Sequence, residues 1–116
     1  MDHIVIAVAT WTAAINLAIA AADLVPAGFV LRNSAEVGVP RRWLPLLAAC
    51  KAAGGAGILI GLAVARPLAI AASLGLVLFF VGAVIRHLQT RVRHNLAFPL
   101  VFLASSVATL ALLVAG

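Results

Sequence analysis

Charge is scarce in this chain of 116 residues, which has eight lysines and arginines, three acidic residues and three histidines. Hydrophobic residues make up 66% of the sequence, and a soluble domain of this length could not cover so much apolar surface. The net charge of +5 would suggest nucleic acid in a soluble protein. No basic patch is interleaved with aromatic residues, so we expect no nucleic-acid partner and interpret the arginines as anchors to anionic lipid headgroups.

The residues of common enzyme sites are also missing. Cys50 is the single cysteine, so one chain can form neither a disulfide nor a CxxC redox pair, and we interpret this thiol as a small buried apolar residue. The three histidines, His3, His87 and His94, have no metal-ligand spacing. We find no nucleophile-with-base motif and no glycine-rich phosphate loop, and therefore expect no metal site and no complete catalytic set.

Four apolar stretches fill most of the chain, and nearly every charge lies between them. They cover residues 4–31, 44–65, 67–85 and 96–115. Each is long enough to cross the ~30 Å hydrocarbon core as a helix of ~20 residues, and a segment in lipid must satisfy its backbone polar groups internally. The sequence therefore predicts an all-α protein, an antiparallel four-helix transmembrane bundle that forms one domain over residues 1–116.

The arginines predict the orientation of this bundle. Six lie in the first and third gaps between stretches, whereas Arg66 alone lies in the second. The positive-inside rule then places residues 32–43 and 86–95 in the cytoplasm and both termini outside. The first stretch lacks a basic n-region and exceeds the ~7–15 residues of a signal-peptide core, so we expect it to be an uncleaved helix.

Prolines predict where the helices break. Pro26 lies inside the first stretch, so this helix should kink or end near Val25, and residues 27–31 are a candidate second segment along the membrane interface. Pro67 can open the third helix, where its missing N–H costs nothing. Trp43 lies where an interfacial aromatic anchor belongs.

Small residues recur in the second stretch, at Ala53, Gly57 and Gly61, with Gly54 beside them. Such residues let helix backbones approach closely in lipid, where hydrophobicity no longer drives association. Two interpretations stay open at this point: the glycines only pack the bundle, or they open a small cavity for a ligand. The large side chains lie elsewhere in the sequence, at Phe79, Phe80, Phe98 and Phe102.

Asp23 and Lys51 are ionisable residues at membrane depth, where each costs at least ~2.5–3.5 kcal/mol and is a candidate functional residue. Each lies seven residues from the same interface, which Val30 and Leu44 mark. At ~1.5 Å per residue, both side chains lie about 10 Å inside that interface. We therefore predict that they face the bundle interior and interact, either as a structural ion pair or as part of a site.

Further polar residues lie in the predicted spans. Thr12 and Asn16 share a helix face with Asp23, and Asn16 lies near the membrane midplane. Ser105, Ser106 and Thr109 have similar depth in the last span and can hydrogen-bond across the bundle or to their own helix. His87 lies beside Arg86 at the end of the third span, where it is an interfacial anchor or a titrating or anion-binding group.

The runs WLPLLAACKAAGGAGILIGL and ARPLAIAASLGLVLFFVGAVIRHL, with a short basic loop and a last apolar helix, resemble the DoxX-like family of small membrane proteins. Lys51 before a glycine-rich run, Pro67–Leu68, and Gly82–Ala83 followed by His87 carry the resemblance. It implies a four-helix bundle in a bacterial inner membrane. Relatives include a subunit of a thiosulfate:quinone oxidoreductase, proteins linked to redox stress, and more distant assembly factors. Many relatives have a glutamate where this chain has Lys51.

Three functions compete on these grounds. The first is an accessory or binding subunit that holds a small hydrophobic ligand, for which the resemblance suggests a quinone, or that supports a partner membrane protein or a second copy of itself. The second is an intramembrane enzyme that uses Asp23, Lys51 or His87 for proton transfer on a lipid-soluble substrate. The third is a four-helix transporter, which the strong arginine bias disfavours.

For the first function we expect a pocket that opens toward the cytoplasmic half. Glycine removes side-chain volume where two charges and an amide converge, and concave apolar sites with a few polar groups are the usual ligand sites. The ammonium of Lys51 would suit an anionic or carbonyl-bearing apolar molecule. The expected pocket residues are Asn16, Asp23, Lys51, Gly54 and Gly57, with His87 as a further candidate.

Overall fold

The structure is a computed structural model that describes residues 2–116. These residues form five α-helices and one 3₁₀ turn: α1 (His3–Leu24), α2 (Gly28–Glu36), η1 (Arg41–Trp43), α3 (Leu44–Val64), α4 (Arg66–Gln89) and α5 (Ala97–Ala115). Four segments are long and apolar enough to cross a membrane, namely α1, α3 with its preceding 3₁₀ turn, α4 and α5. The predicted all-α four-helix membrane bundle is therefore confirmed for the described residues.

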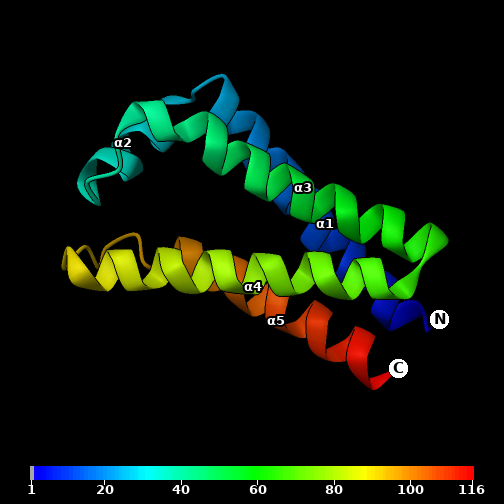
Figure 1. Cartoon of the computed structure of the whole chain (residues 1–116). Helices are drawn as coiled ribbons and strands as arrows, with labels where there is room; N and C mark the ends of the chain where they lie inside the picture. The colour runs from blue at the N-terminus through cyan, green and yellow to red at the C-terminus, as the bar shows by residue number, and fades with distance from the viewer. Residues whose placement is uncertain (1) are drawn as a thin grey trace.

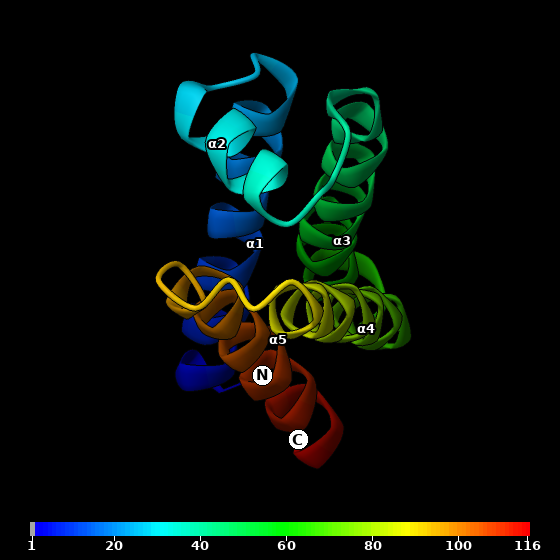
Figure 2. The ribbon, with the colours of Figure 1, turned by 90° about the vertical axis from the view of Figure 1, so that its left-hand side faces the viewer.

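The four long helices pack in a ring, with α1 against α3 and α5, and α4 against α3 and α5. Both termini lie at one end of the bundle, which we call the termini end, and α2 lies at the other (Figure 1). We call that other end the arginine-rich end, because α2, η1, the end of α4 and the α4–α5 connection carry all arginines but Arg66. Viewed from the arginine-rich end, α3 and α4 diverge from each other, and the chain that joins α2 to α3 spans the gap between those two helices (Figure 2).

The first apolar stretch is two helices rather than one helix over residues 4–31. α1 begins with Asp2, whose carboxylate accepts a 2.8 Å hydrogen bond from the Ile4 amide. It ends at Leu24, directly before the predicted break, because Pro26 cannot donate to continue the helix. α2 then runs to Glu36, five residues beyond the predicted short segment and into the predicted loop. The break confirms the proline argument, whereas the expected single helix was too long.

α3 and α4 meet at a sharp corner at the termini end. Ala65 alone separates them, with extended backbone angles (φ −155°, ψ 112°), and Pro67 lies in the first turn of α4 as predicted. Arg66 Nε donates a 2.8 Å hydrogen bond to the carbonyl of Leu113 and so ties α4 to the end of α5. At its other end α4 continues to Gln89, which places Arg86 and His87 on a helix rather than in the loop expected over residues 86–95.

The glycines of α3 bring helix backbones together. A Cβ atom added to Gly61 would lie 2.2 Å from the amide nitrogen of Ala69 on α4, and one added to Gly57 would lie 2.8 Å from the Cβ of Ala72. A Cβ atom at Gly54 would lie 2.4 Å from the side chain of Leu76. A larger residue at Gly57 or Gly61 would require movement of α4, whereas one at Gly54 would require the Leu76 side chain to shift. Of the two interpretations of these glycines, the structure supports close packing.

Hydroxyl side chains connect α1 and α5 near the middle of the bundle. Thr12 is fully buried, bonds the Thr109 hydroxyl at 2.8 Å, contacts the Ser105 hydroxyl, and donates to the Ser105 carbonyl at 3.1 Å. Ser106 instead donates to the Phe102 carbonyl of its own helix. Both open alternatives for these residues therefore occur: Ser105 bonds across the bundle, Ser106 bonds to its own helix, and Thr109 does both, since its hydroxyl also donates to the Ser105 carbonyl at 3.0 Å.

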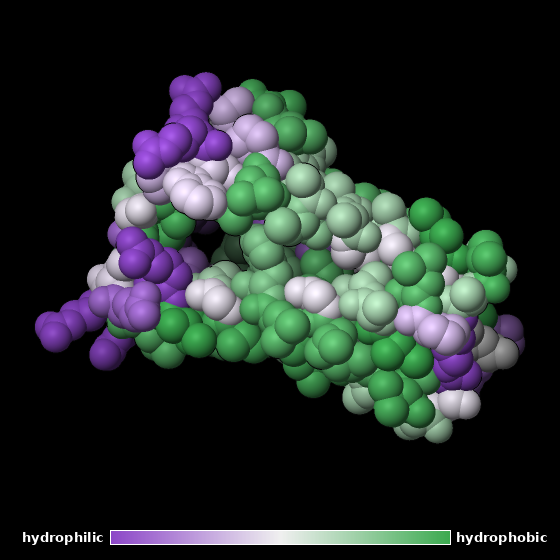
Figure 3. Space-filling model, viewed as in Figure 1, coloured by the Kyte–Doolittle hydropathy of each residue, from purple (hydrophilic) through white to green (hydrophobic). Residues whose placement is uncertain are grey.

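The outer surface of the long helices is apolar, and polar residues gather mainly at the arginine-rich end (Figure 3). Large side chains such as Leu78 and Ile60 are 64% and 54% exposed, as expected for positions in contact with lipid. Cys50 is also exposed, which corrects the expectation that it is buried. It precedes Lys51 on α3 and lies on the outer side of that helix.

Candidate functional site

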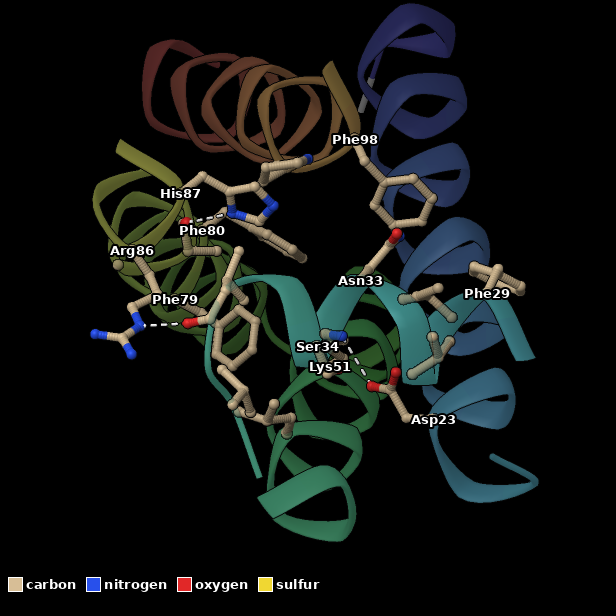
Figure 4. A pocket seen from close by; sticks show the side chains of 18 residues that line it. Asp23, Phe29, Asn33, Ser34, Lys51, Phe79, Phe80, Arg86, His87 and Phe98 are labelled. Atoms are coloured by element: carbon tan, nitrogen blue, oxygen red, sulfur yellow. Dashed lines mark hydrogen bonds and ion pairs between the residues drawn. The ribbon is translucent and has the colours of Figure 1, made fainter. Parts of the chain in front are cut away.

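A cavity of about 310 Å³ lies at the arginine-rich end, where α3 and α4 diverge. All five helices contribute to its wall, and a hollow is visible there between α3 and α4 in the space-filling view (Figure 3). Aliphatic and aromatic side chains form most of the wall. The polar residues that line it are Asp23, Asn33, Ser34, Lys51, Arg86 and His87 (Figure 4).

The apolar side of this cavity is lined by phenylalanines from three helices, Phe29, Phe79, Phe80 and Phe98, and Phe102 packs against two of them without lining the cavity. Ring centroids are 5.0 Å apart between Phe79 and Phe80, 5.1 Å between Phe80 and Phe102, and 5.2 Å between Phe102 and Phe98. Phe29 of α2 extends the series, with its centroid 6.3 Å from that of Phe98. Because aromatic rings are rigid, this series supports the wall from α2 across α5 to α4.

A buried ion pair also lines the cavity. Lys51 Nζ donates to Asp23 Oδ2 at 2.8 Å, and the two side chains are only 12% and 3% exposed. Lys51 Nζ also lies 5.6 Å from the centroid of the Phe79 ring, within range of a cation–π interaction. The predicted pairing is confirmed. The ion pair joins α1 to α3, and because Asp23 neutralises Lys51, it removes the reason to expect an anionic ligand.

His87 lies on α4 and points into the same cavity, with 9% of the residue exposed. Its Nδ1 lies 2.9 Å from the carbonyl oxygen of Ala83, one turn earlier. A carbonyl only accepts hydrogen bonds, so Nδ1 carries the proton, and in the neutral ring Nε2 is an acceptor. Figure 4 shows this second nitrogen turned toward Asn33 and Phe98.

Arg86 of α4 holds the end of α2, which forms part of the cavity wall, in place. The sequence did not reveal this role. Arg86 Nε donates a 2.7 Å hydrogen bond to the carbonyl of Val37, which directly follows α2, and its guanidinium turns away from the cavity (Figure 4). Gly38 then takes a left-handed conformation (φ 72°) that favours glycine, and an added Cβ would lie 2.8 Å from Arg86 Nη2. A second tie joins Glu36 to His94 at 2.6 Å.

Three predicted pocket residues do not line the cavity. Asn16 is fully buried deeper in the bundle, where Nδ2 donates to the Thr12 carbonyl at 2.9 Å and Oδ1 has no partner among the described residues. Gly54 and Gly57 pack against α4, as described above. Asp23, Lys51 and His87 are the predicted residues that the structure brings to one cavity.

Two signals in the sequence could have indicated the remaining wall. α2 is amphipathic, so its Asn33 and Ser34 can face the cavity. Gly82 lines the cavity in a helix of large residues, and an added Cβ there would meet no atom within 4 Å.

Within residues 2–116 no group of three or more His, Cys, Asp and Glu side chains could hold a metal ion.

The model of the DoxX-like family matches residues 7–109 of the chain. The chain belongs to the DoxX-like family. The match extends over the cavity, the Asp23–Lys51 ion pair and most of each membrane span, so the resemblance seen in the second and third spans also includes the first. No curated protein and no solved structure matches the chain at a significant level.

Proposed function

We propose that this DoxX-like membrane protein is an accessory or binding subunit that holds a small hydrophobic molecule in the cavity at its arginine-rich end. The observation that carries the proposal is the cavity itself: about 310 Å³, walled by phenylalanines, with a buried ion pair and one buried histidine. Ligand sites are usually concave and largely apolar, have volumes of about 300–1,000 Å³, and contain a few placed polar groups.

The polar groups favour a molecule without net charge. Asp23 and Lys51 cancel each other, and the Arg86 guanidinium turns outward to hold Val37. Lys51 has three N–H donors and uses one on Asp23, so it can also donate to a carbonyl oxygen of a bound molecule. A quinone has the size class, the apolar ring and the carbonyl groups that this wall would accept.

The test is native mass spectrometry of small molecules that co-purify with the protein in mild detergent. Lys51→Met should lower the amount of retained molecule at least several-fold, because it removes the cavity's only ammonium group within the described residues. Cys50→Ala is the matched control. Cys50 is the neighbour of Lys51 in the sequence, but its side chain is exposed on the outer side of α3, so this substitution should leave retention unchanged. Full retention in Lys51→Met, with the bundle intact, would contradict the proposal.

A second function is favoured by one observation. Asp23, Lys51 and His87 line one cavity, so a carboxylate, an ammonium group and an imidazole would all face the same bound molecule. That arrangement would suit an intramembrane enzyme that transfers protons on a lipid-soluble substrate. Incubation of the purified protein with its own co-purified molecule separates the two functions, because a binding subunit returns the molecule unchanged and an enzyme converts it to a new mass.

We further propose that the protein lies in a bacterial inner membrane with the arginine-rich end in the cytoplasm. The six arginines at this end support the orientation through the positive-inside rule. The test is thiol labelling of a Glu36→Cys, Cys50→Ala variant in intact cells. Labelling only after the membrane is opened supports the orientation, whereas labelling by a membrane-impermeant reagent in intact cells would reverse it.

A further inference from the structure

His87 is a buried residue whose Nε2 faces the cavity, and no described residue donates a hydrogen bond to that nitrogen. We infer that the molecule in the cavity carries a hydroxyl group that donates to His87 Nε2. This inference rests on the proposed binding function and specifies its ligand: an apolar alcohol or phenol, which for a quinone means its reduced, hydroxyl-bearing form, rather than an ether, an ester or a plain hydrocarbon.

The direction of this hydrogen bond follows from the one His87 already makes. The proton of the neutral ring is fixed on Nδ1 by the Ala83 carbonyl at 2.9 Å, which leaves Nε2 only a lone pair. A carbonyl group on the ligand therefore gains nothing at this position, because two acceptors repel. A buried acceptor that loses water without finding a donor destabilises the complex, so the donor must come from the ligand.

The surroundings of His87 favour a flat, apolar body behind the hydroxyl. Phe80 and Phe98 line the same cavity, and Figure 4 shows the His87 ring beside them. Aromatic side chains pack well against a second ring in offset or edge-to-face contact. A phenol satisfies both conditions, since its hydroxyl lies at the edge of an apolar ring.

Other acceptors in the wall are distinguishable from His87. Asp23 uses Oδ2 for Lys51, and its second oxygen could in principle accept from a hydroxyl. Asn33 points its amide toward the cavity from α2 (Figure 4). A variant at His87 alone therefore decides which acceptor the hydroxyl uses.

The experiment uses the full chain in lipid nanodiscs and two matched probes, 4-hexylphenol and its methyl ether 4-hexylanisole. Binding is measured by calorimetry, and the signal from empty nanodiscs is subtracted. We expect the phenol to bind about ten-fold more tightly than the ether, because only the phenol has a donor for Nε2.

Variants at His87 test the assignment to this residue. His87→Phe keeps a ring but loses the acceptor, so the preference for the phenol should fall to about two-fold or less. His87→Gln restores an acceptor oxygen and should recover most of the preference. His3→Phe, at the termini end, is the control and should keep the full preference.

The outcomes separate this inference from the function on which it rests. Equal affinity of the two probes in the wild-type protein overturns the inference while leaving a binding cavity. A preference retained in His87→Phe also overturns it and assigns the hydroxyl to another acceptor. Absence of saturable binding for both probes overturns the proposed function as well. If His87→Phe does not fold, the wild-type comparison and His87→Gln still decide the question.

Discussion

At the termini end, α3 and α4 lie in backbone contact, whereas at the arginine-rich end the same two helices diverge around a cavity of about 310 Å³. In the packed half, Gly57 and Gly61 leave no room for a Cβ atom because α4 occupies that space. In the open half, Gly82 faces space that no atom fills within 4 Å of an added Cβ. The glycines of α3 therefore bring two helices into contact, whereas Gly82 lines the cavity without such a contact.

Within residues 2–116, polar atoms without a partner occur outside the cavity as well, at Asn16 Oδ1 and Arg66 Nη2, but neither residue lines it. Thr12, in the packed half, satisfies its hydroxyl within the protein through Ser105 and Thr109. In the open half, His87 Nε2 has no partner among the described residues, and Lys51 retains donors beyond its bond to Asp23. A polar group in lipid costs free energy unless it is paired. The comparison teaches that incomplete pairing beside open space, rather than glycine content, marks the site.

The largest effect is expected from filling the packed half. Gly61→Leu should prevent assembly of the bundle, because its Cβ would lie 2.2 Å from the backbone nitrogen of Ala69, and backbone cannot rotate away as a side chain can. The expected loss exceeds about 3 kcal/mol in the free energy of unfolding, above the usual cost of overpacking. Denaturation in mixed micelles, followed by circular dichroism, measures it.

Gly75→Leu is the matched control for this change. Its added Cβ meets no atom within 4 Å, and it lies on the exposed side of α4. The free energy of unfolding should change by no more than about 0.5 kcal/mol. Similar losses in Gly61→Leu and Gly75→Leu would contradict the distinction between a packed α3–α4 contact and a free face.

The ion pair of the open half should show the next largest effect. Lys51→Met leaves the Asp23 carboxylate buried without its partner and should lower the free energy of unfolding by about 3–5 kcal/mol. The double variant Lys51→Met, Asp23→Leu should recover most of this loss, since no uncompensated charge remains. The same denaturation assay applies, and equal stabilities of the single and double variants would contradict the pairing.

A smaller effect is expected from the hydroxyl contacts of the packed half. Thr12→Val keeps the shape of the side chain and removes the hydrogen bonds to Ser105 and Thr109. Hydrogen bonds between transmembrane helices contribute on average about 0.6 kcal/mol and at most about 1.7 kcal/mol. The free energy of unfolding should therefore fall by about 1–2 kcal/mol. Thr10→Val, at an exposed position of α1, should be neutral, and an equal loss in both variants would sink this account.

The sequence predicted features that depend on a single helix or on the depth of a residue in the membrane. Hydropathy predicted the four spans, Pro26 predicted the end of α1 near Val25, and equal depth from one interface predicted the pairing of Asp23 with Lys51. These predictions need only the rise of a helix and the thickness of a bilayer.

The location of the cavity could not be predicted in this way. It depends on how far α3 and α4 diverge, and the divergence results from the contacts of Gly54, Gly57 and Gly61 at one end and of bulky phenylalanines at the other. The glycines therefore suggested a cavity where they in fact close the bundle. Residues that line the true cavity, such as Asn33 and Arg86, lay in or beside the predicted loops.

The central claim is that open space in the arginine-rich half holds a molecule. The most direct test compares Gly82→Leu, which adds a large side chain at a residue that lines the cavity, with Gly75→Leu, which adds the same side chain two turns away on the same helix at a residue that does not line it. Mass spectrometry of co-purified small molecules should show loss of the retained molecule in Gly82→Leu and full retention in Gly75→Leu, with both variants as stable as the wild-type protein. Full retention in a folded Gly82→Leu variant would contradict the account.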